Sequence, residues 1–340
     1  MYFQRFYDEG LAHASYLIGC QRDGVAIVID AARYVQPYLD AAAAQGLNIV
    51  AATETHIHAD YLSGTRQLSA KTGAKMYLSG EGGPDWSYQF AGANDIIVRD
   101  GDQIVVGNLS LKVLHTPGHT PEHISFLLTD HPASEQPMGL FTGDFLFVGD
   151  VGRPDLLERA AGYKDTMREG AKRLFYSLQK LKELPDHLQI WPAHGAGSAC
   201  GKALGAVPSS VLGFERYSNW ALAIDSEEEF VEAVLDGQPE PPKYFAEMKR
   251  MNKVGPSLLA DSEPKFSDLE RLKAVVDQEE LLVDLRGVEA FALGHLAGSL
   301  FLPSGKPLVT WAGWLLPFFA AVNCHSARRV VRSAPWNCPM

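Results

Sequence analysis

Long uninterrupted runs of apolar residues are missing from this sequence of 340 residues. A membrane-spanning helix needs roughly 20 consecutive apolar residues, and no stretch of the chain approaches that length. The opening residues, MYFQRFYDEG, also lack the basic-then-apolar pattern of a secretory signal. We therefore expect a cytoplasmic protein that has no membrane partner.

Cysteine and positive charge are scarce as well. The four cysteines show no Cys-x-x-Cys spacing, which argues against zinc knuckles and against the disulfide framework of small secreted domains. Thirty Lys and Arg residues against 41 Asp and Glu residues give a net charge of -11, whereas nucleic-acid binding normally requires a basic face. We expect small-molecule partners and no nucleic-acid partner.

The composition is otherwise that of an ordinary globular protein, with 46% hydrophobic and 21% charged residues. A chain of this length has room for two domains with their own cores. Strand-like and helix-like patterns alternate from the start of the chain, and mainly strand-like patterns run from Ile96 to Gly149. Apolar residues at steps of three and four predict an amphipathic helix between Tyr163 and Leu184. These proportions predict an α/β fold with sheets inside and helices outside.

A proline-rich stretch, DGQPEPPKYF from Asp236 to Phe245, interrupts this pattern. We place the end of the main domain near it, so that residues 1–240 form the domain and residues 241–264 a linker. A second unit is expected over residues 265–340. Ser267 and Glu270 there form a capping box at the start of a helix, and ELLVDLR predicts a strand.

The stretch THIHADYLSG follows a predicted buried strand and concentrates possible metal ligands. His56, His58 and Asp60 lie two residues apart, and such residues share one face of an extended backbone, so a loop leaving the strand can turn several toward one point. Histidine pairs with this spacing also occur without binding anything. Tyr61 stands where one more histidine would extend the run.

Three other segments place a ligand type just beyond a predicted strand. HTPGHTPEH contains His119 in a turn rich in Gly and Pro, FTGDFLFVGD contains Asp144, and IWPAHGAG contains His194. Four separate strand ends that each offer a ligand are hard to attribute to chance. The pattern therefore favours a metal site.

These segments, in this order, resemble the metallo-β-lactamase superfamily over roughly residues 1–235. The resemblance implies an αββα sandwich that gathers metal ligands at the strand ends of one edge. More narrowly, TGDFLFVGDVGRPD and PAHGAGSACGKALGAVPSS are similar to the persulfide dioxygenases, especially to the form fused to rhodanese modules.

Resemblance to the persulfide dioxygenases implies one Fe(II) ion per chain, held by His56, His119 and Asp144. Two imidazoles and one carboxylate suit a non-heme iron with open positions. Two-metal relatives carry histidine at the position of Tyr61, and a neutral phenol is a poor replacement for imidazole, so we expect a single metal. The remaining groups, His58, Asp60 and His194, are then expected to orient the ligands and bound water, although a purely structural role for Asp60 and His194 stays open.

Two further residues are candidates for substrate contact. The resemblance suggests that Arg153 in GDVGRPD supports the site or a substrate channel, while an internal ion pair of Arg153 with Asp155 that only fixes the loop is an equal alternative. Tyr176, on the predicted long helix, is expected to face either substrate or core.

The reaction implied is oxidation of a low-molecular-weight thiol persulfide, such as glutathione persulfide, by O2 and water to sulfite and the thiol. The resemblance also suggests a homo-oligomer. One alternative is a zinc-dependent thioester hydrolase of the glyoxalase II type, which shares the fold and the three ligand positions. Another is a non-catalytic sulfur-binding or scaffolding protein, which would hold no metal.

The C-terminal part resembles the opening of a rhodanese module, from Leu281 to Pro303. Cys324 precedes Arg329 with the spacing of the sulfur-carrying loop, but VNCHSARRVVR lacks the glycine of that loop. Four basic residues and no acidic one occur from Phe301 to Met340. We therefore predict an incomplete rhodanese-like segment without sulfur-transfer activity, with an atypical tail from about residue 318.

Overall fold

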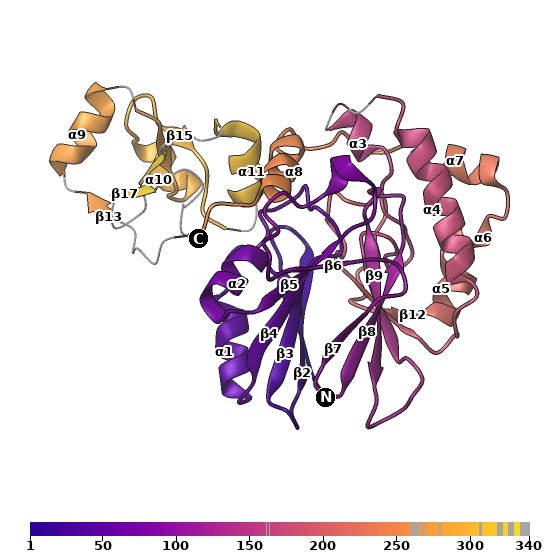
Figure 1. Ribbon diagram of the computed structural model, residues 1–340. Coiled ribbons are helices and arrows are strands. Elements are labelled where there is room, and N and C mark those ends of the chain that lie inside the picture. Colours follow the sequence, from indigo (N-terminus) through magenta and orange to yellow (C-terminus); the bar gives the residue numbers. More distant parts are fainter. Residues whose placement is uncertain are drawn as a thin grey trace. The chain divides into compact units, whose positions relative to one another are not determined.

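The computed structural model divides into two compact units, Met1–Ser257 and Leu258–Met340 (Figure 1). No helix in the described part of the chain is long and apolar enough to cross a membrane. The structure describes residues 1–160, 162, 164–259, 265–267, 269–278, 280–305, 308–317, 322–325 and 330–333.

The first unit contains two sheets of six strands each. In the first sheet the strand order follows the chain, β1 to β6, with antiparallel pairing up to β3 and parallel pairing beyond it. Its strands are β1 (Tyr2–Asp8), β2 (His13–Cys20), β3 (Val25–Ile29), β4 (Asn48–Thr53), β5 (Lys75–Ser79) and β6 (Ile96–Val98).

The second sheet has the order β12-β11-β10-β9-β8-β7, in which only β10 and β11 are parallel. Gly107 and Asn108 form the short turn between β7 and β8, and the connections from β8 to β9 and from β9 to β10 contain prolines. The strands are β7 (Gln103–Val106), β8 (Leu109–His115), β9 (Ile124–Asp130), β10 (Gly139–Gly143), β11 (Gln189–Pro192) and β12 (Ser210–Val211).

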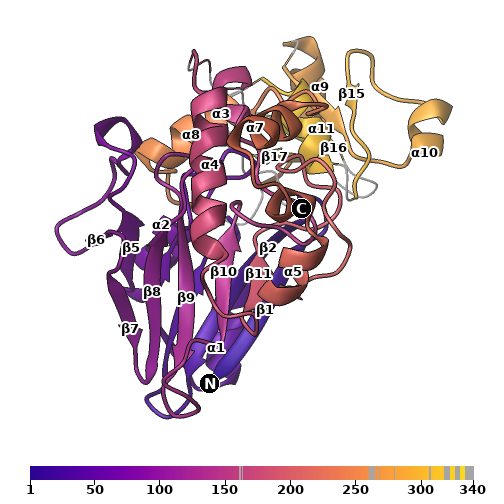
Figure 2. The ribbon, with the colours of Figure 1, turned by 90° about the vertical axis from the view of Figure 1, so that its right-hand side faces the viewer.

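Helices cover the outer face of each sheet. Figure 1 shows the resulting four layers edge-on, and Figure 2 looks onto the helices that cover the second sheet. The predicted αββα sandwich is therefore confirmed. Helices α1 (Gln36–Ala44) and α2 (Thr65–Thr72) pack on the first sheet. On the second sheet lie α4 (Met167–Leu181), α5 (Leu212–Ser218), α6 (Trp220–Ala223) and α7 (Glu227–Leu235). Two short elements, η1 (Pro84–Trp86) and α3 (Leu156–Arg159), lie in connections.

Local sequence signals set the ends of several helices. Gly73 follows α2 with φ 74°, a left-handed conformation that glycine adopts without strain and that ends a helix. Ser226 caps α7 by accepting a hydrogen bond from the N–H of Glu229 at 3.3 Å. In α4 the stripe formed by Ala171, Leu174, Leu178 and Leu181 is buried, which confirms the predicted amphipathic helix.

The main core lies between the two sheets and joins apolar side chains from both. The sheets also meet along an edge, where His13 of β2 forms a β-bridge with His194 beyond β11. Two backbone hydrogen bonds, from Ala14 N–H to Ala193 O and from Gly195 N–H to Ala12 O, close this contact. The loop after β11 is thereby fixed to the first sheet.

The structure differs from the sequence-based expectation beyond the proline-rich stretch. Part of the expected linker forms helix α8 (Phe245–Val254), which belongs to the first unit. The helix buries Phe245, Met248 and Met251, whose spacing of three residues places them on one face. Burial of this apolar stripe is the physical reason that the segment packs on the first unit.

The second unit contains a five-stranded sheet with the order β13-β17-β16-β14-β15. Val283, Leu302 and Cys324 form its small buried cluster. Arg329 and residues 318–321 of the predicted atypical tail lie outside the described residues. The elements are β13 (Lys265–Ser267), α9 (Leu269–Asp277), β14 (Leu282–Asp284), α10 (Val288–Leu293), β15 (Leu300–Phe301), α11 (Leu308–Leu315), β16 (Val322–His325) and β17 (Val330–Ser333).

Candidate metal centre

Loops beyond four strands bring the predicted polar residues to one edge of the sandwich. The loop after β4 carries His56, His58 and Asp60, and the loops after β8, β10 and β11 carry His119, Asp144 and His194. All six side chains are buried, with exposed fractions of 7% or less. Buried ionisable groups require partners or a metal, so this edge is the candidate functional site.

The three predicted ligands His56, His119 and Asp144 form one group. Each offers a ligand atom, and these atoms all lie within 4.8 Å of one another. Nε2 of His119 lies 3.6 Å from Oδ2 of Asp144, which is longer than a hydrogen bond. Two imidazole nitrogens and one carboxylate that converge without bonding each other directly fit a divalent metal ion.

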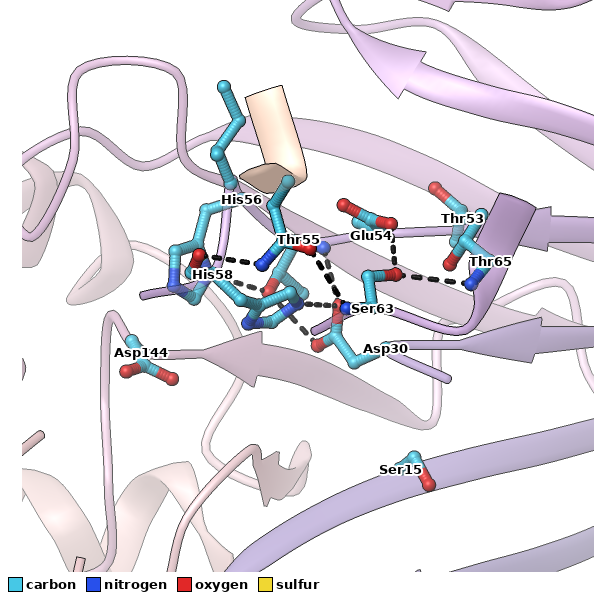
Figure 3. A network of polar contacts seen from close by, with 12 residues as sticks. Ser15, Asp30, Thr53, Glu54, Thr55, His56, His58, Ser63, Thr65 and Asp144 are labelled. Atoms are coloured by element: carbon cyan, nitrogen blue, oxygen red, sulfur yellow. Dashed lines mark hydrogen bonds and ion pairs between the residues drawn. The ribbon is translucent and has the colours of Figure 1, made fainter. Parts of the chain in front are cut away.

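Hydrogen bonds orient the imidazole of His56. The hydroxyl of Thr55 donates to Oδ2 of Asp30 at 2.9 Å and lies 3.0 Å from Nδ1 of His56 (Figure 3). Because that hydroxyl proton is already used, Nδ1 acts as the donor to Thr55. Nε2 is then left with its lone pair, the form of imidazole that binds a metal.

His119 and Asp144 are oriented by the backbone around them. The carbonyl of Arg153 accepts a hydrogen bond from Nδ1 of His119 at 3.1 Å, so the Nε2 lone pair of His119 faces Asp144. The N–H of Asp144 donates to Nε2 of His123 at 3.1 Å. Gly143 has φ 53°, and a Cβ there would meet Nε2 of His123 at 2.6 Å. Glycine is therefore required where the strand turns to present Asp144.

Burial decides the charge states in this group. Desolvation lowers the pKa values of His56 and His119 well below the usual histidine value, so both rings are neutral. Burial, with a smaller opposing contribution from His194, raises the pKa of Asp144 to about 6. The centre therefore combines two neutral donors with one carboxylate that is ionised at neutral pH.

His58 points to a different partner. Its Nε2 lies 3.1 Å from Oδ1 of Asp30, which also accepts a hydrogen bond from the N–H of Thr55 at 2.7 Å. Burial lowers the pKa of His58, but the charge of Asp30 and the hydrogen bond to it raise that pKa to about 9. His58 is thus tied to the first sheet through Asp30 at the end of β3.

A second group of possible ligands consists of Asp60, His194 and Cys200, whose ligand atoms also lie within 4.8 Å of one another. Nδ1 of His194 donates to the carbonyl of Ala12 at 3.1 Å, which leaves Nε2 facing the carboxylates of the site. That nitrogen lies 3.3 Å from Oδ2 of Asp60 and 3.4 Å from Oδ1 of Asp144. Nitrogen, oxygen and sulfur donors of this kind fit zinc.

Tyr61 belongs to neither of these two groups of possible metal ligands. Its hydroxyl donates a hydrogen bond to the carbonyl of Asp30 at 3.2 Å, and its ring lies beside the rings of His13 and His58. Burial, together with nearby carboxylates, raises the pKa of Tyr61 well above its ordinary value of 10.0. The phenol therefore stays neutral and is a poor metal ligand.

The side chains of the two predicted substrate contacts, Arg153 and Tyr176, have protein partners outside these groups. The Arg153 guanidinium is fully buried, pairs with Asp155 at 2.8 Å, and donates to the carbonyls of Ala199 and Pro239. The hydroxyl of Tyr176 donates to Glu227 at 2.6 Å, and 56% of the tyrosine is exposed. Contact of Arg153 and Tyr176 with substrate stays a prediction.

Two residues that lie at the site, Asp30 and Cys200, are not among those predicted from the sequence. Asp30 ends the strand-like VAIVID, and an acidic residue at a strand end was an available signal. Cys200 lies six residues beyond His194 in the irregular loop after β11. No repeating sequence pattern marks it as a residue of the site. Burial and the nearby carboxylates of Asp144 and Asp60 raise the pKa of the Cys200 thiol well above 9.0.

Comparison with known proteins agrees with this geometry. The model of the metallo-beta-lactamase superfamily matches residues 8–194. A hydroxyacylglutathione hydrolase of Rhodospirillum rubrum is 31% identical over 180 residues, which cover 53% of this chain and 60% of the relative. The mitochondrial persulfide dioxygenase ETHE1 of Homo sapiens is 32% identical over 185 residues, which cover 53% of this chain and 63% of the relative. The chain thus matches these curated relatives over less than two thirds of their length.

Two solved structures are similar over more of the chain. A metallo-beta-lactamase from Staphylococcus aureus subsp. aureus COL is 45% identical with a TM-score of 0.87, and the match covers 95% of this chain and 91% of that chain. ETHE1 from Myxococcus xanthus is 27% identical with a TM-score of 0.61, and the match covers 74% of this chain and 98% of that chain. Because the superfamily model matches more than half of the residues and the fold agrees, the chain belongs to the metallo-beta-lactamase superfamily.

Proposed function

We propose that the chain is a persulfide dioxygenase that holds one Fe(II) ion between His56, His119 and Asp144. The substrate is a low-molecular-weight thiol persulfide, such as glutathione persulfide. One persulfide, one O2 and one water give one thiol, one sulfite and two protons. The S–S bond breaks, the terminal sulfur is oxidised, and O2 is the electron acceptor.

The donor set is the observation that carries this proposal. Two neutral imidazoles and one ionisable carboxylate converge at the first group, while Tyr61 donates its hydroxyl to the Asp30 carbonyl instead of adding a ligand near Asp60. A bound Fe(II) ion supplies open coordination positions for a substrate sulfur and O2. The similarity to persulfide dioxygenases of about 30% identity points in the same direction.

The chain's own residues hold and shield the reacting groups in this proposal. The pair formed by His58 and Asp30 fixes the loop that carries His56. Burial of His56, His119 and Asp144 limits the access of bulk water to the site. We propose that a single positioned water molecule therefore releases the sulfite. His194 lies beside both Asp60 and Asp144, and we propose that Asp60 and His194 orient that water.

Oxygen uptake by the Fe(II)-loaded protein tests the function directly. Addition of glutathione persulfide is expected to produce O2 consumption and sulfite release in equal amounts. His119→Ala is expected to abolish both, because a ligand is lost, whereas Lys112→Ala, which changes an exposed residue of β8, is expected to leave both unchanged. Full sulfite production by His119→Ala would contradict the proposal.

A zinc-dependent thioester hydrolase of the glyoxalase II type is the second candidate. It is favoured by the group of Asp60, His194 and Cys200, which offers donors for a second ion, and by the similarity to hydroxyacylglutathione hydrolases. Metal analysis and a thioester assay with the zinc-loaded protein separate the two functions. Thioester hydrolysis without O2 uptake would favour the hydrolase.

The cytoplasmic location, the homo-oligomeric state and a second domain that begins near residue 265 remain part of the proposal. So does the rhodanese-like character of the second unit. Size determination in solution tests the oligomeric state, and persulfides of different thiols, compared by kcat/KM, test the substrate class.

A further inference from the structure

The loop that carries His56 and His58 has no regular secondary structure, so its backbone groups need partners elsewhere. It connects β4 with α2 and is buried over nearly its whole length. An unpaired buried backbone group costs about as much free energy as a lost hydrogen bond. The partners that these groups use therefore determine the shape of the loop.

A single side chain of α8 pairs three of those backbone groups. Nδ2 of Asn252 donates to the carbonyl of His58 at 2.8 Å and to the carbonyl of Tyr61 at 2.7 Å. Oδ1 of Asn252 accepts a hydrogen bond from the N–H of Ser63 at 2.9 Å. Asn252 is 1% exposed, so water does not compete for these bonds. The amide thus clamps both sides of the turn that contains Asp60.

A second side chain of α8 holds the residue between the two histidines. Nζ of Lys249 donates to the carbonyl of Ile57 at 3.1 Å, and the N–H of Ile57 donates to Oε1 of Glu122 at 2.9 Å. The Ile57 side chain is fully buried. Nζ also lies 4.9 Å from the centre of the Trp86 ring, within range of a cation-π contact. The backbone of Ile57 is therefore fixed between a cationic and a carboxylate group.

Helix α8 lies outside the segment, residues 8–194, that the superfamily model matches. It is also separated along the chain by 192 residues at Lys249 and by 194 at Asn252 from the carbonyls that these side chains bind. Buried apolar residues hold the helix on the first unit. Its polar side chains are therefore available as rigid supports of the loop.

We propose that Lys249 and Asn252 of α8 are positioning residues of the metal centre, which hold the His56–Ser63 loop in its metal-binding shape. They act through the backbone of the loop, and no hydrogen bond among the described residues joins either side chain to a proposed ligand side chain. The proposal concerns metal binding at His56, His119 and Asp144 and does not depend on which reaction follows. Loss of such supporting contacts typically weakens metal affinity 10–100-fold.

Titration of the metal-free full chain with Co(II), followed by its visible absorption, tests this proposal. Lys249→Met keeps the apolar stem but removes the donor, and Asn252→Ala removes all three hydrogen bonds. Each is expected to raise the Kd for Co(II) about 10–100-fold and to alter the absorption spectrum. Thermal unfolding of the metal-free variants shows whether each remains folded at the titration temperature.

Two matched controls remove similar groups without touching the loop. Arg250→Met removes a positive charge from the exposed face of α8, and Asn48→Ala removes an exposed amide that donates to the Gly24 carbonyl. Both are expected to bind Co(II) with unchanged Kd and spectrum. If Asn252→Ala does not fold, the Co(II) titration of Lys249→Met is sufficient to test the proposal. Folded Lys249→Met with an unchanged Kd and spectrum would overturn the proposal, as would equal weakening in the controls.

Discussion

Nε2 of His58 lies 3.1 Å from Oδ1 of Asp30, and both side chains are buried. The backbone of Asp30 has φ 54°, in the left-handed region that Asp and Asn adopt more readily than other side-chain-bearing residues. The same carboxylate accepts hydrogen bonds from Thr55, whose hydroxyl orients His56. Asp30 at the end of β3 therefore controls the orientation of both histidines.

Asp30→Asn is expected to weaken metal binding without changing the backbone. Asn tolerates the same φ but carries no charge, so it supports His58 and Thr55 less strongly. We expect the Kd for Zn(II), measured by calorimetric titration of the metal-free protein, to rise about 10–100-fold. Asp40→Asn, on the exposed face of α1, is the control for removal of one negative charge. Unchanged zinc affinity in Asp30→Asn would show that the carboxylate does not support the site.

Tyr61→His is expected to create a second strong metal position. The imidazole would add a nitrogen donor beside Asp60 and His194, whereas the present phenol is neutral and bonded to the Asp30 carbonyl. We expect the zinc content of the variant to rise from about one to about two ions per chain. Tyr61→Phe, which removes only the hydroxyl, is expected to keep the content of the unchanged protein. Metal analysis after dialysis that left Tyr61→His at one ion would contradict this prediction.

The raised pKa of Asp144 predicts that the free energy of unfolding of the metal-free protein falls as the pH rises. Its pKa is about 6 in the folded chain, against 3.8 for an ordinary aspartate, because burial disfavours the charged form. The ionised group therefore destabilises the fold above pH 6, and this cost disappears as the pH falls toward 3.8. Two pKa units correspond to a cost on the order of 3 kcal/mol.

Asp144→Asn in the presence of a chelator tests this sign. At pH 7.5 the variant is expected to unfold with a free energy higher than that of the unchanged protein by up to about 3 kcal/mol, and the difference is expected to shrink below pH 5. Denaturant unfolding at several pH values measures it. A variant less stable than the parent at pH 7.5 would show that Asp144 is stabilised by its neighbours when ionised.

Local sequence patterns were sufficient to predict the strand ends that carry His56, His119, Asp144 and His194. His119, Asp144 and His194 follow apolar runs closed by Gly or Pro, and His56 follows the largely apolar run NIVAA, so strand periodicity and turn chemistry place all four near the carboxyl end of a strand. The α/β class, with sheets inside and helices outside, followed from the same alternation, whereas the αββα sandwich came from the resemblance to the metallo-β-lactamase superfamily. These features depend on residues close together in the chain, which is why the sequence predicts them.

The supports of the site depend on distant contacts instead. Asn252 and Lys249 act across 194 and 192 residues, and no periodic pattern marks a side chain for such a partner. Helix α8 follows a proline-rich stretch that predicted a linker. Its packing on the first unit is what shows that the segment belongs to that unit. Cys200 likewise joins Asp60 and His194 through the course of an irregular loop.

Cys324 is predicted to transfer no sulfur to cyanide. It lies within β16, where it is paired with Val283 of β14 and Val331 of β17, and 3% of the residue is exposed. A sulfur-carrying cysteine needs an accessible thiolate, whereas a buried strand position among apolar neighbours favours the unreactive thiol. Cyanide-dependent thiocyanate formation from thiosulfate is therefore expected to be absent from the full chain and from Cys324→Ala alike. Thiocyanate formation that disappears in Cys324→Ala would mean that β16 opens to expose the thiol, and the second unit would then be a working sulfurtransferase.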